Sequence, residues 1–517
     1  MDMIGRNYLA RLKAEFKGYS AVSFSKDLLA GITCTAVALP LSLAFGVSSG
    51  ADAAAGLVCA IIAGVVIGGL SGASYQISGP TGAMAAILTS LCAQYGLQGL
   101  FVAGFLSGLL LLLFALFKVG SLVSSIPKPV VTGFTSGIAV VIAHGQLDNV
   151  FGTHAKGIGV VAKLSSYFTL GFHPSAIPVM FTALAVLVMV FWPKRLGRII
   201  PGSLCAIIIC LILELVFGFE CAVVGTIPRT LITSDRLRFS LLADTSLWTF
   251  FPPALSIALL GMIESLLCGA SAGKMKGEKL DATQELFAQG VGNLIIPFFG
   301  GIPATAAIAR TSVAIKSGGV TRLVSIIHSI GLLLSMFLFS SLMEQIPLSA
   351  LAGVLLVTAW RMNEWPAIKV IFSKRIKTSI AMFLTTMVTT VVFDLTIAIV
   401  AGVGISVILF VVKERRTLTI TVTTEADEKL VTVKGHLFFA TQDKLIETVR
   451  ALKAEGAKRI TISLAGVHDI DHSEADELES ICLDLEKSGI NVSLEGVNPE
   501  VRIMLDRLGM VFHKEKI

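Results

Sequence analysis

Apolar runs of about 20 residues recur along most of this chain, from Leu28 to Val412. A helix needs roughly 20 consecutive apolar residues to cross the ~30 Å hydrocarbon core of a bilayer, so each run predicts a transmembrane helix. The composition agrees, because 54% of the residues are hydrophobic and only 15% are charged, against about 25% charged in soluble domains. The sequence therefore predicts an α-helical polytopic membrane protein embedded in the lipid bilayer.

We expect about fourteen spans. They are 28–47, 54–72, 80–95, 98–117, 129–145, 176–192, 200–218, 249–272, 285–300, 303–315, 323–343, 347–361, 378–393 and 395–412. The spans that begin at Pro80 and Pro303 are too short to cross as complete helices, so half-helices are predicted there. Lys and Arg follow the even-numbered spans, as at Lys118, Lys274 and Lys413, and basic residues stay on the cytoplasmic side. Both termini are therefore expected in the cytoplasm, with the chain in the inner (plasma) membrane.

The composition changes abruptly after Arg416, where apolar and polar residues begin to alternate as in half-buried strands. Strand and helix patterns then alternate to the end, which predicts a small α/β domain. We therefore divide the chain into a cytoplasmic N-terminal segment at 1–26, a transmembrane domain at 27–416 and a cytoplasmic domain at 417–517.

Several function classes are not expected for this chain. The excess of 41 Lys and Arg over 35 Asp and Glu is small and dispersed, which argues against a nucleic-acid partner. The chain has no glycine-rich nucleotide loop and no catalytic triad pattern. We expect no enzyme activity, no cofactor and no metal site.

The apolar region contains a weak internal repeat. Residues 79–84 resemble residues 302–307, with their prolines 223 positions apart. An Ile-Pro pair occurs at 126–127 and again at 346–347, which is a spacing of 220 positions. Each unit holds about seven spans, and an odd number makes the second unit enter the membrane from the opposite side. The sequence therefore predicts a 7+7 inverted repeat. Short segments interrupted by Pro and Gly at matching positions of such repeats point to the binding site of a secondary transporter.

The two half-helices favour an anion as the ligand. The first turn of a helix leaves its N–H groups without intrahelical partners and carries about half a positive charge, so two opposed N-termini form a positive pocket. Small residues let a ligand approach that backbone. The expected substrate-binding residues are Gly79, Pro80, Thr81, Gly82, Ala304, Thr305 and Ala306. The alternative is that the prolines start ordinary membrane helices and the glycines serve packing.

Glu264 lies within the eighth expected span. A carboxylate in a membrane helix is costly unless it is protonated, paired or hydrated, so Glu264 is predicted to have a functional role. The repeat offset places it opposite Leu41, beside Pro40 in the first span. A structural salt bridge is the alternative role. Gln146 and His144, at the outer end of the fifth span, are expected to face the loop.

These residues resemble the sulfate permease (SulP) family of anion transporters with a C-terminal STAS domain. The resemblance covers nearly the whole chain and rests on several stretches taken together. They are DLLAG at 27–31, LP at 39–40, ISGPT at 77–81, IP at 126–127, GFT at 133–135, QELFAQG at 284–290 with Asn293, GGIP at 300–303 with ART at 309–311, and FDL at 393–395.

The resemblance implies a uracil-permease-like fold with a core of spans 1–4 and 8–11 and a gate of spans 5–7 and 12–14. Family members commonly work as homodimers, move the core against the gate in an elevator-like step, and carry sulfate, bicarbonate, chloride, oxalate or dicarboxylates. The fold does not select the substrate. We expect a secondary active transporter of a small inorganic or carboxylate anion. An uncoupled channel or exchanger is one alternative. A nucleobase permease is another, although the half-helices offer few polar side chains for base edges.

Departures from the family pattern bear on the pocket and on coupling. The family often has Gln after the first-span proline, whereas this chain has Leu41 after Pro40, which removes a polar side chain from the presumed pocket. Sodium-coupled bicarbonate members of the family have a stretch similar to Asp-Ser-Leu-Leu-Thr on the eighth span, where this chain has Glu264 to Cys268. A thiol is a poor ligand for Na⁺, which prefers hard oxygens. We therefore expect H⁺ as the coupling ion at Glu264 and Cys268, with Na⁺ as the alternative.

In the C-terminal domain, residues 470–473 resemble the loop of anti-sigma-factor antagonists in which a serine is phosphorylated. Ser473 is the matching serine, but His472 and Glu474 replace the small residues expected beside it. A regulatory or packing role without phosphorylation is therefore expected for Ser473.

Overall fold

The computed structural model describes residues 2–120, 128–157, 160–193, 196–198, 200–244, 246–373, 377–392, 419–425, 428–437, 442–470, 472–498, 501, 502 and 505. The chain divides into two compact units, one formed by residues 1–123, 135–363 and 387–400 and the other by residues 124–134, 364–386 and 401–517. The fourteenth expected span, 395–412, and the Ile-Pro pair at 126–127 lie outside the described residues.

Most expected spans correspond to helices. Among the described residues, six helical segments are long and apolar enough to cross a membrane. They are α2 (Ala21–Ser48), α3 (Ala53–Leu70), α4 (Gly82–Leu116), α5 (Lys128–Gly145) with α6 (Leu147–Phe151), η3 (Leu247–Phe250) with α11 (Phe251–Lys276), and α14 (Leu323–Met343). Shorter apolar helices are α8 (Ala176–Phe191), α9 (Gly202–Phe217), α15 (Leu348–Met362) and α17 (Lys377–Val392). The count of fourteen spans stays a prediction.

The long helix α4 is broken at Gly96, which has a φ of 69° and a ψ of −179°. Glycine adopts this conformation without the steric cost of a Cβ. The break falls between the spans expected at 80–95 and 98–117. The shorter elements among the described residues of the transmembrane region are α7 (Val160–Leu170), η2 (Leu196–Arg198), α10 (Phe239–Asp244), α12 (Ala282–Ile295), η4 (Ile296–Phe299), α13 (Ile308–Lys316) and α16 (Trp365–Ser373).

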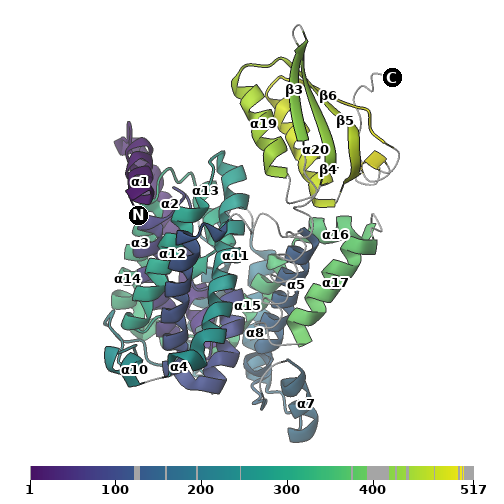
Figure 1. The fold of residues 1–517 in the computed structure, drawn as a ribbon. Coiled ribbons are helices and arrows are strands. Elements are labelled where there is room, and N and C mark those ends of the chain that lie inside the picture. The colour runs from purple at the N-terminus through teal and green to yellow at the C-terminus, as the bar shows by residue number, and fades with distance from the viewer. Residues whose placement is uncertain are drawn as a thin grey trace. The chain divides into compact units, whose positions relative to one another are not determined.

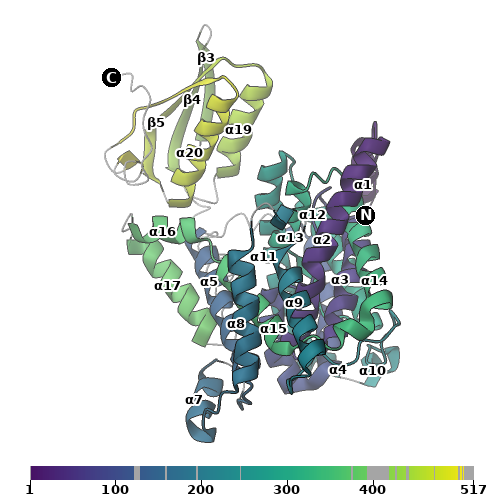
Figure 2. The ribbon, with the colours of Figure 1, turned by 180° about the vertical axis from the view of Figure 1, so that it is seen from behind.

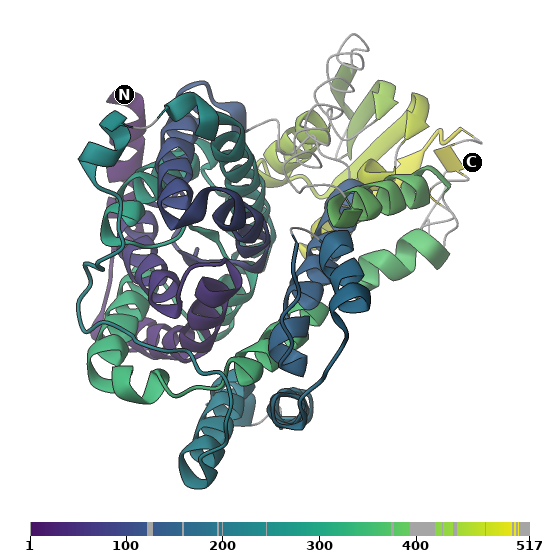
Figure 3. The same cartoon turned by 90° about the horizontal axis from the view of Figure 1, so that it is seen from below.

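Helices from both halves of the apolar region interleave in one bundle. α4 packs against α11 and α12, α14 packs against α2 and α3, and α13 packs against α2 and α11. Figure 3 shows the purple N-terminal helices and the teal later helices gathered in this bundle. α8, α9 and α15 pack against one another in a second group, and α2 also contacts α9 and α15.

Small residues allow close approach within the first bundle. A Cβ built on Gly64 of α3 would lie 1.9 Å from Ser329 Oγ of α14. A Cβ on Gly46 of α2 would lie 2.4 Å from the carbonyl oxygen of Asp52. Membrane helices associate through such packing because lipid tails supply no hydrophobic driving force between them.

Two short strands pair within the first bundle. β1 (Ser78–Gly79) runs antiparallel to β2 (Thr305–Ala306), with Ser78 opposite Ala306 and Gly79 opposite Thr305. β1 leads into α4, and β2 leads into α13. The expected start of the second half-helix at Pro303 is wrong, because α13 begins at Ile308. Pro303 and Ala304 are not helical, and in β2 the backbone pairs with β1 instead of forming helical hydrogen bonds.

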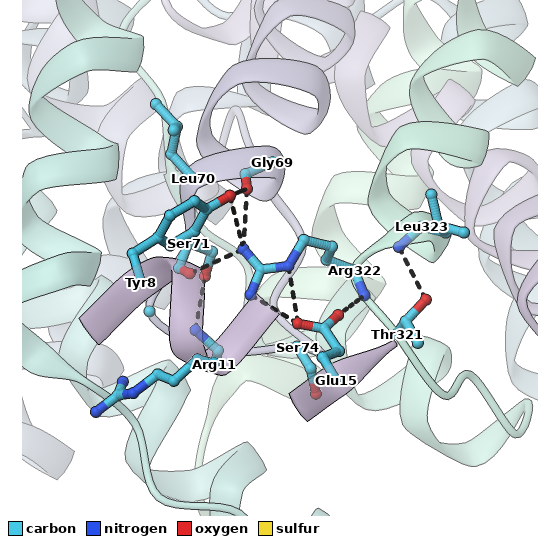
Figure 4. A network of polar contacts seen from close by, with 12 residues as sticks. Tyr8, Arg11, Glu15, Gly69, Leu70, Ser71, Ser74, Thr321, Arg322 and Leu323 are labelled. Carbon is cyan, nitrogen blue, oxygen red and sulfur yellow. Dashed lines mark hydrogen bonds and ion pairs between the residues drawn. The ribbon is translucent and has the colours of Figure 1, made fainter. Parts of the chain in front are cut away.

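The N-terminal helix α1 (Asp2–Glu15) is tied to the transmembrane region by a buried ion pair, shown in Figure 4. Arg322 Nη2 and Nε donate to Glu15 Oε2 at 2.7 and 2.9 Å. Arg322 Nη1 donates to the Gly69 carbonyl oxygen at 2.9 Å, and the Tyr8 hydroxyl donates to the same oxygen at 2.6 Å. Since Gly69 lies near the end of α3 and Arg322 caps α14, α1 joins the ends of both helices.

The C-terminal domain is a four-stranded sheet covered by helices, which confirms the predicted α/β domain. Its strands, in the order β3-β4-β5-β6, are Thr419–Glu425, Glu428–Leu437, Arg459–Ile470 and Asn491–Glu495. β3 and β4 are antiparallel, whereas β4, β5 and β6 are parallel. α19 (Gln442–Ala454) and α20 (His472–Lys487) connect the parallel strands and cover one face of the sheet (Figures 1 and 2). Val431, Leu445 and Ile462 are among its fully buried residues.

Candidate functional site

Two helix N-termini meet at the paired strands β1 and β2. Thr81 caps α4, because its Oγ1 accepts a hydrogen bond from the Met84 backbone N–H at 3.3 Å. Ala307 occupies the N-cap position of α13 without a side-chain capping hydrogen bond, and its backbone N–H donates to the Ile77 carbonyl oxygen at 2.9 Å. Because the strands are antiparallel, the two helices leave opposite ends of the pair. The first-turn N–H groups of both helices have no carbonyl partner within their own helix, and they contribute positive potential around the strands.

The Glu264 carboxylate on α11 joins the two halves of this arrangement. A single oxygen, Oε2, accepts hydrogen bonds from Thr81 Oγ1 at 2.8 Å and from Thr305 Oγ1 at 2.7 Å. The adjacent Ser265 Oγ accepts a hydrogen bond from the Ala306 backbone N–H at 3.2 Å. Glu264 is half-buried, so it is neither in bulk solvent nor sealed in the bundle. The carboxylate therefore contacts the cap of one half-helix and the strand that leads into the other.

Arg310 on α13 adds a buried positive charge to the site. Its side chain is 1% exposed, and its Nη2 donates to the Pro80 carbonyl oxygen at 2.6 Å. Sequence reasoning noted this residue only within a family motif and gave it no role. The cost of a charge within a membrane helix, which singled out Glu264, applies equally to an arginine and would have identified it.

The seven predicted substrate-binding residues come together at the strand pair, and all of them are buried. Gly79 is constrained most tightly, because its φ of 156° is unfavourable for other residues. A Cβ built on Gly79 would lie 2.6 Å from Arg310 Nη1. Whether these residues bind substrate stays a prediction.

Pro40, Leu41 and Cys268, assigned to the first and eighth spans, are also buried. Pro40 and Leu41 lie inside α2, and Phe45, one turn later, faces the start of α4, where its Cε1 is 3.2 Å from a Cβ built on Gly82. Cys268 lies one turn after Glu264, and its Sγ donates to Thr311 Oγ1 at 3.5 Å. Cys268 therefore binds α13, whereas Glu264 binds Thr81 and Thr305.

Two side chains of α12 form hydrogen bonds with β1 and with the residue directly before β2. The sequence analysis gave neither side chain a role. Gln289 Nε2 donates to Ser78 Oγ in β1 at 3.0 Å. The Asn293 amide donates to the Ala304 carbonyl oxygen at 3.0 Å and accepts from the Ala304 N–H at 2.8 Å. The signal for both was their polar character within an apolar span.

Gln146 does not face the loop as expected. It is 3% exposed, and its Nε2 donates to Ser48 Oγ at the end of α2 at 3.2 Å. The polar end of α2 packs against it and provides the partner that a buried amide requires. His144 is half-buried. Ser473 lies near the start of α20, but its side chain is outside the described residues, as is Asp471.

The whole chain is similar to known anion transporters. Residues 24–389 match the sulfate permease family, and residues 417–514 match the STAS domain. The chain is 34% identical to the putative sulfate transporter YvdB of Bacillus subtilis (strain 168), over 98% of this chain and 97% of that protein. It is 30% identical to the bicarbonate transporter BicA of a Picosynechococcus species, over 74% of this chain and 69% of that protein.

Two solved structures share the fold. The transmembrane domain of a cyanobacterium bicarbonate transporter BicA has a TM-score of 0.67 at 29% identity, covering 73% of this chain and 97% of that chain. The overall structure of SLC26A9 has a TM-score of 0.69, covering 96% of this chain and 88% of that chain. At 16% identity, the second likeness shows the fold alone. The helical membrane fold with a C-terminal STAS domain is thereby confirmed.

Proposed function

Since the chain belongs to the sulfate permease family and is an integral membrane anion transporter rather than an enzyme, we propose that it is a proton-coupled secondary active transporter. Its substrate is a small anion of the sulfate, bicarbonate or dicarboxylate class. We place it in the inner (plasma) membrane as a homodimer with both termini in the cytoplasm. The names of its relatives, which are sulfate and bicarbonate transporters, support this substrate class.

Anion binding is proposed at the N-termini of α4 and α13. The two half-helices contribute first-turn N–H groups, and the buried Arg310 guanidinium contributes a full charge beside Pro80. Gly79, Ala304 and Ala306 carry no side chain or only a methyl group, so no bulky side chain of these residues covers the backbone of the site. The combination suits a compact anion better than a neutral ligand, because a positive potential in a region of low dielectric attracts negative charge strongly.

The observation that carries proton coupling is the contact of Glu264 Oε2 with both Thr81 and Thr305. An ionised carboxylate at this position repels an incoming anion, whereas a protonated one does not. A protonated carboxyl still accepts both hydroxyl hydrogen bonds through its carbonyl oxygen. Proton and anion therefore favour each other's binding, which is the requirement for symport.

The proposed movement is an elevator-like step of a core against a gate. The first bundle, with α2, α3, α4 and α11 to α14, holds the paired strands and would be the moving core. The second group, with α8, α9 and α15, contacts the first through α2. A core that carries the complete site can move without losing the geometry of the site.

Sodium coupling is the second candidate. Glu264, Thr81 and Thr305 bring together three oxygen-bearing side chains of the kind that Na⁺ prefers. Cys268, which would extend this set by one turn, offers a thiol that donates to Thr311. An uncoupled channel or exchanger is the third candidate, and it requires no protonation change at Glu264.

The test is uptake of radiolabelled sulfate, bicarbonate and a dicarboxylate by the full-length protein in liposomes, with proton and sodium gradients imposed separately. We expect accumulation driven by the proton gradient, and collapse of that accumulation with a protonophore. Sodium-driven accumulation at fixed pH would favour the second candidate. Equilibration without accumulation under either gradient would favour the channel.

Glu264→Gln tests the assignment of the coupling residue. The substitution keeps the side chain neutral and close to its natural size, so we expect loss of proton-driven accumulation while anion binding persists. Loss of the negative charge also removes repulsion, so affinity at neutral pH is expected to be equal or higher. Proton-driven accumulation that survives Glu264→Gln would exclude Glu264 as the proton carrier.

A further inference from the structure

Three buried polar residues lie on one face of α12 within the transmembrane bundle. Glu285, Gln289 and Asn293 are spaced by four residues and are 0%, 0% and 1% exposed. Residues four apart lie on the same side of a helix. Buried polar groups are costly without partners, so each of these side chains requires hydrogen bonds inside the protein.

The outer two members of this polar face have different partners. Asn293 forms a two-way hydrogen bond with the backbone of Ala304, directly before β2. Glu285 Oε2 accepts from Ser71 Oγ at 2.6 Å and from the Gly72 N–H at 3.0 Å, in the segment between α3 and β1. One helix face therefore contacts the chain that leads into each of the two strands.

Gln289 lies between them and reaches β1 itself. Its Nε2 donates to Ser78 Oγ at 3.0 Å and to Glu285 Oε1 at 2.9 Å. An amide nitrogen has two hydrogens, so these acceptors use both and fix the rotation of the amide. Rotation by half a turn would bring the amide oxygen against the carboxylate of Glu285, which is unfavourable while Glu285 is ionised.

We propose that Gln289 and Glu285 are positioning residues of the anion site. Gln289 acts through Ser78, which holds β1 in register with β2, and Glu285 acts through the amide of Gln289. The inference rests on the proposed function, because it concerns the same site. In this proposal, α12 sets the relative positions of the two half-helix N-termini, although Gln289 and Glu285 do not contact the anion directly.

Gln284 provides a matched control on the same helix. It is also a buried amide, 4% exposed, and its Nε2 donates to the Leu70 carbonyl oxygen at the end of α3 at 2.7 Å. Gln284→Ala therefore removes a comparable buried hydrogen bond without a contact to either strand. An effect of Gln289→Ala that exceeds that of Gln284→Ala reports on the strand contact rather than on general stability.

The experiment uses the full-length protein in liposomes and compares the half-saturating concentration (KM) of the anion that the parent transports best. We expect Gln289→Ala and Ser78→Ala each to raise KM about tenfold, the scale of one buried hydrogen bond. The double variant should be no worse than either single variant, because both remove the same interaction. Gln284→Ala should leave KM within about twofold of the parent.

Glu285→Ala tests the indirect part of the proposal. It removes the second acceptor of the Gln289 amide, so the single Glu285→Ala substitution should raise KM. The Glu285→Ala, Gln289→Ala double variant should have a KM no higher than that of either single variant. If the KM increases of the two single variants multiply in the double variant, Glu285 acts independently of Gln289. That result would overturn the proposed action of Glu285 through the Gln289 amide.

Hydrogen–deuterium exchange in detergent provides a readout that needs no transport. Gln289→Ala should accelerate exchange in residues 76–82 and 303–308, whereas Gln284→Ala should leave these segments unchanged. Unchanged exchange in Gln289→Ala, or an unchanged KM despite faster exchange, would overturn the proposal. If the parent takes up none of the anions tested, the proposed function fails, and exchange alone then decides whether Gln289 positions β1.

Discussion

At the scale of single residues, two conditions at Gly79 coincide. Its φ of 156° disfavours a side chain, and the position that a Cβ would occupy is 2.6 Å from Arg310 Nη1. The backbone of β1 thus comes close to a charge that cannot move away easily, because Arg310 Nη2 is bound to the Pro80 carbonyl oxygen. Glycine at this position keeps the strand and the guanidinium together.

Gly79→Ala is therefore expected to reduce stability by about 1–3 kcal/mol, the usual cost of a strained backbone, and to abolish anion uptake. Gly69→Ala in α3 is the control, since nothing lies within 4 Å of a Cβ built there. That variant should keep the thermal midpoint and the uptake of the parent. Normal uptake in Gly79→Ala would show that this backbone position tolerates displacement.

Bulky substitutions at the N-termini of the two half-helices should affect anion binding without unfolding the protein. A Cβ built on Gly82 would lie 2.4 Å from Ile142 Cδ1, the flexible end of a side chain, so a larger residue there can be accommodated by local movement. We expect Gly82→Leu and Ala306→Leu to fold but to lose anion binding, because the added side chains cover the helix N-termini. Calorimetric titration of purified protein measures this, and undiminished binding by either variant would remove its segment from the site.

At the scale of elements, two ion pairs of different burial join the N-terminal helix to the bundle among the side chains that the structure describes. The side chains of Glu15 and Arg322 are 9% and 7% exposed, whereas those of Arg11 and Asp281 are 49% and 22% exposed. Both pairs connect α1 to segments that are distant in sequence. Their difference in burial allows the two contributions to be separated.

Glu15→Ala should destabilise the protein by about 3–5 kcal/mol, because it leaves the Arg322 guanidinium buried without its counter-ion. Arg11→Ala should cost at most about 1 kcal/mol, as is usual for an exposed ion pair. Thermal unfolding and hydrogen exchange of residues 2–15 measure both effects. Equal losses in the two variants would contradict the role assigned to burial.

At the scale of the whole molecule, the C-terminal domain has its own core. Buried residues from β4, β5, β6, α19 and α20 form one cluster, which includes Val433, Val449, Ile460 and Leu478. A domain with a separate core and a complete strand and helix pattern is expected to fold alone. The transmembrane unit holds all of the candidate substrate and coupling residues.

Residues 417–517 expressed alone should therefore unfold cooperatively on heating, as followed by circular dichroism. Deletion of this domain from the full chain should impair expression, dimer behaviour or regulation more than the choice of anion. Competition uptake with a panel of anions measures that choice. A truncated protein with normal assembly and an altered anion preference would contradict this division of roles.

Much of the architecture is readable from the sequence because its causes are local. Apolar runs long enough for a bilayer predicted the helices, the break near Gly96 appeared as a gap between two runs, and the cost of a charge in lipid singled out Glu264. The alternation of apolar and polar residues after Arg416 predicted the α/β domain.

The tertiary structure alone decided how these parts meet. Sequence similarity between two proline segments suggested Pro303 as a helix start, but pairing of β2 with β1 delays the helix to Ile308. Thr81 and Thr305 share one oxygen of Glu264 although Thr81 is 183 residues from it. Such hydrogen bonds join segments that local patterns describe separately, so only the packed bundle determines which donor reaches which acceptor. The same holds for Gln289 in α12. Its position in an apolar span predicted its burial, but only the fold determined its hydrogen bond to Ser78, which is 211 residues away.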